Sequence, residues 1–195
     1  VSLAGTSIRG DSILNIQTRL IAQSNGQKGD QLELTNAFNE SIWEATIASQ
    51  NIQDFEKELA AISHDFIKRF RKKGIIKKRE QTEIINVVYN TWLNPWMYEF
   101  IRYSPSIDIP NIKCNVLVLI GSKDIQVTSK ENIKGYEQLL PKNEKLHLVK
   151  ELKGLNHLFQ SCKTCTISEY GEIEETFSTI ALEEIRFFLN TIWLE

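Results

Sequence analysis

The chain has 195 residues, of which 42% are hydrophobic and 25% charged. This is the composition of a soluble globular protein rather than of a collagen-like, coiled-coil or disordered chain. Lys and Arg total 23 against 25 Asp and Glu, and the resulting net charge of −2 gives no support to a nucleic-acid partner. No apolar run reaches the ~20 residues that a membrane-spanning helix requires, and Cys114, Cys162 and Cys165 are too few for a disulfide scaffold.

The first residues indicate that the chain begins inside a strand. It opens Val1-Ser2-Leu3-Ala4-Gly5, without Met and without a signal peptide. A buried strand is an unusual natural start, so we expect a fragment or the C-terminal part of a longer polypeptide. Any targeting signal would then lie upstream, which leaves the compartment unknown. The outer edge of Val1–Ala4 would be exposed and could pair with a missing N-terminal segment or with a second copy in a dimer.

Residues 11–103 carry only helical patterns. Asp11 is suited to cap a first helix, and Asn51 to cap a third that should end at Gly74. Asn94-Pro95 should start a fifth helix, because Pro is favoured at the first helical position. Apolar residues recur at helical spacing in the stretches between these signals, at Leu34, Phe38, Ile42 and Ala45, at Phe55 to Phe70, and from Glu80 to Leu93.

The second half changes character. Ser104-Pro105 and Ile109-Pro110 predict a rigid, extended link. Strands are expected over 116–120 and 146–152, with a helix over 129–140 between them and a closing helix over 178–193. The first of these strands is continuously apolar, which is typical of a strand covered on both faces in a parallel sheet. The closing helix should present one apolar face, formed by Ile185, Phe188, Leu189 and Ile192. The fold class is therefore α/β.

Two turns that follow these strands each carry a titratable residue. Asp124 comes just after the first strand, and His157 comes just after the second, 33 residues later. Because the carboxyl ends of parallel strands meet at one sheet edge, the two side chains should lie close together. They should hydrogen-bond through Nδ1 of the imidazole, and an Asp beside a His can stabilise the imidazolium of a general base. Alternatively, Asp124 caps a turn and His157 is a surface loop histidine.

These turns resemble those of a known superfamily. The stretch VLVLIGSKDIQV, which contains Asp124, resembles the acid-bearing turn of α/β-hydrolases, and GLNHLFQ, which contains His157, resembles their histidine turn. Residues 3–11 and 169–178 resemble one branch, which comprises bacterial serine hydrolases, esterases and relatives of serine aminopeptidases and dienelactone hydrolases. The match covers nearly all of the chain as the C-terminal portion of such an enzyme. It implies a strand end and turn of the core over 1–10, an inserted helical cap over 11–103 and the C-terminal α/β part of the core over 104–195.

The resemblance also implies an activity. In this family the triad follows the order Ser, Asp, His. Asp124 and His157 would then be catalytic residues of a carboxylesterase- or peptidase-like serine hydrolase, which cleaves ester, thioester or amide bonds of a small acyl substrate through an acyl-enzyme. The Gly-x-Ser-x-Gly nucleophile motif is absent here, and Ser7 does not replace it, because Arg9 stands where the motif requires Gly. We therefore expect the serine upstream and this chain alone to be inactive. No cofactor or metal is implied.

A different class of function stays open. The chain could be a non-catalytic, mostly helical binding or interaction module on a degenerate hydrolase scaffold. The sequence upstream of Val1 distinguishes the two, because the enzyme requires a Gly-x-Ser-x-Gly motif between a strand and a helix.

Three further patterns have simpler interpretations. The Cys162-x-x-Cys165 pair lacks the ligand set of a zinc site and the strand-to-helix setting of a redox motif, which favours two loop cysteines. A basic run over 68–79 is explained by a solvated helix end. An aromatic segment could line a substrate pocket, although burial of the cap is the simpler explanation. Its candidate pocket residues are Trp92, Trp96, Met97 and Phe100.

Overall fold

The computed structural model describes residues 1–193 and divides the chain into two compact units. A sheet unit combines Val1–Arg9 with the chain from Ser104 onward. A helical unit is formed by Gly10–Tyr103. The expected change at residue 104, from helical patterns alone to alternating strands and helices, therefore coincides with a boundary between two units.

The sheet unit is built on three parallel strands in the order β1-β2-β3. They are β1 (Ser2–Leu3), β2 (Val116–Gly121) and β3 (His147–Leu152). Every residue of β2 is buried, as its continuous apolar sequence predicts. Gly121 pairs with Leu152 in the parallel register, so β2 and β3 end side by side. The predicted strands and their parallel arrangement are confirmed.

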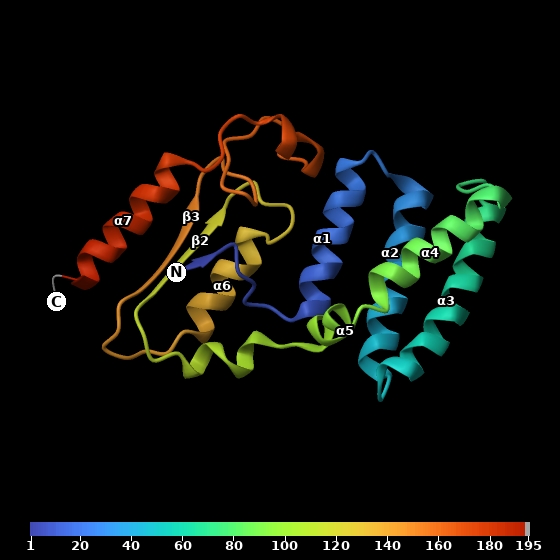
Figure 1. Ribbon diagram of the computed structural model, residues 1–195, viewed down its shortest axis with the longest axis horizontal. Helices are drawn as coiled ribbons and strands as arrows, with labels where there is room; N and C mark the ends of the chain where they lie inside the picture. Colours follow the sequence, from blue (N-terminus) through green and yellow to red (C-terminus); the bar gives the residue numbers. More distant parts are fainter. Residues whose placement is uncertain (194–195) are drawn as a thin grey trace. The chain divides into compact units, whose positions relative to one another are not determined.

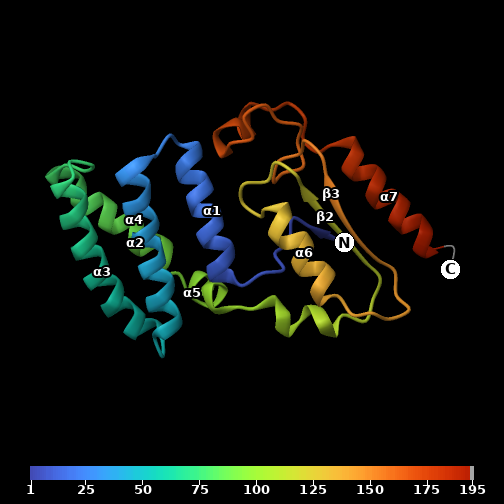
Figure 2. The same cartoon turned by 180° about the vertical axis from the view of Figure 1, so that it is seen from behind.

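Helices cover both faces of this sheet (Figures 1 and 2). Alternate β2 residues point to opposite faces. Leu117 and Leu119 pack in one cluster with Phe188 of α7 (Thr179–Trp193), and Val118 packs in the other with Tyr136 of α6 (Ser129–Leu139). The prediction of the buried face of α7 was wrong at Leu189, which is exposed. Ala181 is buried with Phe188 instead.

The helical unit contains five α-helices and a 3₁₀ turn among its described residues. They are α1 (Gly10–Ser24), α2 (Gly29–Ala48), α3 (Ile52–Lys72), η1 (Lys78–Glu80), α4 (Gln81–Trp92) and α5 (Pro95–Arg102). The expected cap Asn51 is present, since its side chain accepts the backbone N–H of Asp54. Pro95 begins α5 as predicted, and the side chain of Asn94 accepts the N–H of Trp96 there. Asp11 is not a cap but lies in the first turn of α1, where a carboxylate also favours the helix dipole.

The prediction of an extended link between the units was wrong. Two 3₁₀ helices, η2 (Pro105–Ile107) and η3 (Ile109–Asn111), occupy it, each with Pro in its first positions. The φ angle that the proline ring imposes suits a helical turn as well as an extended chain. Ile109 is buried against the α6 face of the sheet, and this packing favours the turn.

The covering of β2 gives a stability prediction. Replacing Leu117, whose side chain is fully buried, by Ala should lower the free energy of unfolding by about 2–5 kcal/mol, since a cavity remains. Leu182→Ala removes the same atoms from a position on α7 that is 52% exposed and should change stability by less than about 0.5 kcal/mol. Denaturant unfolding followed by circular dichroism measures both, and equal losses would contradict the described core.

Candidate functional site

Two turns at the carboxyl ends of β2 and β3 are held together by backbone hydrogen bonds. The N–H of Ser122 donates to the Leu152 carbonyl, and that of Lys123 donates to the Leu155 carbonyl. In return, the Ser122 hydroxyl accepts the N–H of Gly154 at 2.9 Å. Gly121 is required here, because a Cβ at this position would stand 2.3 Å from the Leu155 carbonyl oxygen. The turns are therefore fixed relative to each other before any functional side chain is considered.

Asp124 is buried at the centre of the first turn. Its side chain has no solvent exposure (0%), and its two carboxylate oxygens have different partners. Oδ1 accepts the backbone N–H groups of Gln126 at 2.7 Å and Val127 at 2.8 Å. Oδ2 lies 2.8 Å from Nδ1 of His157. One oxygen thus closes the turn while the other is directed at the imidazole.

His157 is positioned by a turn that Asn156 builds. The Asn156 side chain is fully buried; its Oδ1 accepts the N–H groups of Leu158 and Gln160, and its Nδ2 donates to Gln160 Oε1. The imidazole is 27% exposed, and Nε2 has no hydrogen bond to any residue from 1 to 193. Because a carboxylate only accepts, the hydrogen bond selects the neutral tautomer that carries its proton on Nδ1 and leaves Nε2 as an acceptor. A histidine held in this way can take a proton from a hydroxyl.

Tyr170 lies beside this pair. Its hydroxyl accepts from Gln126 Nε2 at 3.3 Å. Burial raises the pKa of the Tyr170 phenol, and the nearby Asp124 carboxylate raises it further, while hydrogen bonds from Gln126 and the His157 backbone act in the opposite direction. Tyr170 is therefore a neutral phenol at physiological pH.

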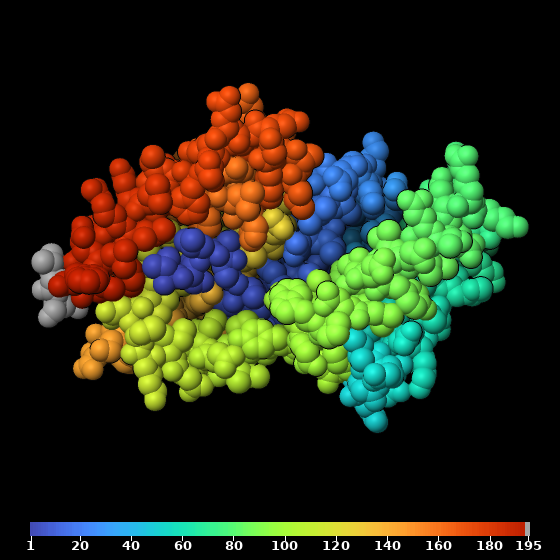
Figure 3. Space-filling model, in the orientation of Figure 1, coloured from blue at the N-terminus to red at the C-terminus, as the bar shows by residue number. Residues whose placement is uncertain are grey.

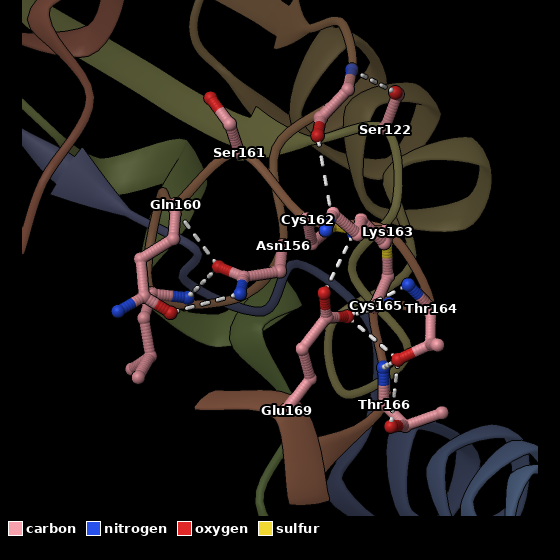
Figure 4. The surroundings of a disulfide bond; sticks show 12 residues. Ser122, Asn156, Gln160, Ser161, Cys162, Lys163, Thr164, Cys165, Thr166 and Glu169 are labelled. Atoms are coloured by element: carbon pink, nitrogen blue, oxygen red, sulfur yellow. Dashed lines mark hydrogen bonds between the residues drawn. A yellow bond between two sulfur atoms is a disulfide. The ribbon is translucent and has the colours of Figure 1, made fainter. Parts of the chain in front are cut away.

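A disulfide loop follows the histidine turn directly (Figure 4). Cys162 and Cys165 are joined, which corrects the interpretation of two separate loop cysteines. The Sγ of Cys162 lies 3.6 Å from the carbonyl oxygen of Gly154, at the start of the histidine turn. The spacing alone could not show this pairing, because two residues between cysteines suit several chemistries.

Glu169, in η4 (Ile167–Glu172), organises the disulfide loop. Its carboxylate accepts the backbone N–H groups of Lys163, Thr164 and Cys165 and the Thr164 hydroxyl. These hydrogen bonds, with that of the Thr164 hydroxyl the largest, lower the pKa of Glu169 from 4.5 to about 2. Neither Glu169 nor Asn156 stands out in the sequence, since their partners lie within a few residues in irregular chain.

The aromatic candidates for a substrate pocket lie in the helical unit, in α4 and α5. Trp92 packs edge-on against Trp43, with ring centroids 4.7 Å apart. Trp96 stacks on Phe100 and is 65% exposed. Trp92 thus contributes to packing within its own unit. A substrate-lining role for Trp92, Trp96, Met97 or Phe100 stays a prediction.

The side chain and backbone of Ser7 are used in hydrogen bonds to Asn132. Its hydroxyl donates to the Asn132 carbonyl at 2.7 Å, and its N–H donates to Asn132 Oδ1 at 2.8 Å.

Over residues 1–193, no three His, Cys, Asp or Glu side chains gather as they would around a metal ion. Within the same residues, no helix is both long and apolar enough to cross a bilayer.

Comparisons of sequence and of fold give no relatives: no protein-family model, curated protein or solved structure matches the chain.

The geometry predicts the tautomer of His157. In Asp124→Asn, the amide oxygen should keep the position of Oδ1, because two backbone N–H groups need an acceptor there. The NH₂ group would then face Nδ1 and donate to it, so the proton should move to Nε2. Long-range ¹H–¹⁵N NMR of the imidazole should show Nδ1–H in the original chain and Nε2–H in the variant. His147, at the start of β3, is the internal control, and an unchanged His157 spectrum would contradict the described hydrogen bond.

The hydrogen bonds of Glu169 predict that the stability of the disulfide loop depends on pH. A depressed pKa contributes stability that is complete above the unfolded value and is lost as pH falls, here from 4.5 toward about 2. Amide protection of Lys163, Thr164 and Cys165 should therefore decline over this interval. Glu169→Gln should show low protection and no such decline, whereas Glu172→Gln, at the end of η4, should behave like the original chain. Hydrogen exchange followed by NMR measures this, and pH-independent protection would refute the role of Glu169.

Proposed function

We propose that Asp124 and His157 are the acid and the base of a serine-hydrolase triad. The observation that supports the proposal is the 2.8 Å contact between Asp124 Oδ2 and His157 Nδ1, with Nε2 left as an acceptor at the carboxyl edge of a parallel sheet. His157 would take the proton of the attacking hydroxyl and deliver it to the leaving group, and Asp124 would stabilise the imidazolium between these steps.

The nucleophile in this proposal comes from another part of the protein. Over residues 1–193, no Ser, Thr or Cys side chain hydrogen-bonds to His157 Nε2, and the sequence has no Gly-x-Ser-x-Gly motif. The chain order of the α/β-hydrolases places the serine before the acid. The proposal therefore assigns the serine and the oxyanion donors to sequence upstream of Val1, and gives the helical unit the place of the cap. The substrate class is a carboxylic ester, thioester or amide, cleaved through an acyl-enzyme.

The test uses the longer polypeptide that includes the coding sequence upstream of Val1. It should hydrolyse p-nitrophenyl acetate with saturation and should react with a fluorophosphonate probe. Both His157→Ala and Asp124→Asn should lower kcat by about 10⁴-fold, because the base is lost in one and held in the wrong tautomer in the other. His147→Ala removes the other histidine of the sheet unit and should retain full activity.

Two outcomes would contradict the proposal. One is hydrolysis that survives in His157→Ala, and the other is the absence of any serine that a fluorophosphonate labels. The first result would show that the activity does not use His157 as its base, and the second would favour a non-catalytic module in which Asp124 only closes its turn. The 195-residue chain alone should not exceed a buffer control containing imidazole, and saturable turnover by it would refute the assignment of the nucleophile upstream.

A further inference from the structure

The cations of the helical unit are concentrated in one short segment. Residues 68–79, here called the basic tip, contain eight Lys and Arg and no Asp or Glu. Since the whole chain has a net charge of −2, acidic residues outnumber basic ones by ten in the rest of it. A helix end needs only one or two cations to offset its dipole. The basic tip therefore carries more positive charge than helix stability explains.

Most of these cations lack a carboxylate partner. Lys73 pairs with Asp30 at 2.6 Å, and longer contacts join Arg69 to Asp65 and Arg79 to Glu80. The other five form no ion pair within the described part of the chain. They are Lys68, Arg71, Lys72, Lys77 and Lys78. Their charges are exposed and available to an external anion.

Four of these five cations line one open groove. It has a volume of about 510 Å³ and is lined by Lys68, Arg71, Lys72, Ile76 and Lys78. No acidic residue lines it, so its charge is complementary to that of phosphate anions. Ile76 is the single apolar residue among the cations of the groove.

The turn that carries the groove has a fixed shape. Gly74 has φ +71°, and the N–H of Ile75 donates to the Phe70 carbonyl at 2.9 Å, which is the hydrogen bond of a Schellman cap. The chain reverses here between α3 and η1, and the side chains of the turn project at one end of the helical unit (Figures 1 and 3). The backbone that carries Ile76 therefore has a defined shape without a ligand.

The chemistry around the groove favours lipid over nucleic acid. A single strand would need exposed rings on which its bases stack. The nearby aromatic residues are used inside the helical unit, where Phe66 is 5% exposed and packs on Phe38 with centroids 4.9 Å apart. The cations of the groove, with the half-buried aliphatic Ile76 among them, match the phosphates and the acyl boundary of an anionic bilayer.

We propose that the basic tip docks the protein on an anionic phospholipid surface. The groove receives lipid phosphates, and Ile76 enters the headgroup region. This inference does not depend on the proposed hydrolase activity, since it uses no residue of the sheet unit.

The test is co-sedimentation of the chain with vesicles. Binding should be strong to phosphatidylcholine containing about 30% phosphatidylserine, weak to pure phosphatidylcholine, and reduced by high salt. The triple variant Arg71→Gln, Lys72→Gln, Lys78→Gln should bind about 100-fold more weakly, because each cation contributes about five-fold. A matched control, Lys113→Gln, Lys142→Gln, Lys145→Gln, makes the same change of net charge in the sheet unit and should bind nearly as well as the original chain. Circular dichroism confirms that each variant is folded.

Two further binding measurements test the proposal. Ile76→Ser leaves every charge in place and should weaken binding several-fold, and unchanged binding would refute entry of the tip into the headgroup region. A single-stranded oligonucleotide that binds while phosphatidylserine vesicles do not would overturn the proposal in favour of nucleic acid. Equal losses in the two triple variants would also overturn it, because they would reduce the effect to net charge.

Discussion

The two-sided burial of β2 is the constraint on which the sheet unit depends. All six of its residues are buried, so any shift in its register would break contacts with α6 and α7 together. This register places Gly121 against Leu152, and the absence of a side chain at Gly121 lets the histidine turn approach its backbone. The distance between Asp124 and His157 is therefore a consequence of core packing.

This dependence explains why the Asp–His pair could be predicted from the sequence. The apolar run over 116–120 indicates a covered strand, and a covered strand indicates parallel neighbours whose carboxyl ends share an edge. Asp124 and His157 follow two such strands, so their proximity requires no knowledge of any other side chain. The same reasoning from periodicity and caps located the helices of the helical unit, because those signals are local.

The features that escaped prediction are set by contacts that leave no periodic pattern. Prolines 105 and 110 are compatible with an extended chain and with a turn, and the burial of Ile109 favours the turn. Leu189 belongs to an apolar stripe of α7, but the width of that stripe exceeds the surface that the sheet covers. The disulfide and its organising Glu169 lie in irregular chain, where neither helix nor strand spacing applies.

Two carboxylates of the sheet unit show what separates a structural group from a candidate catalytic one. Glu169 uses both oxygens on the groups of its own loop, three backbone N–H donors and one hydroxyl. Asp124 closes its turn with Oδ1 alone and directs Oδ2 at His157. A turn is satisfied by a single acceptor oxygen, so the second oxygen of Asp124 and the orientation of the imidazole exceed what folding requires. That excess, together with the acceptor left at Nε2, is the physical basis of the proposal that the pair transfers protons.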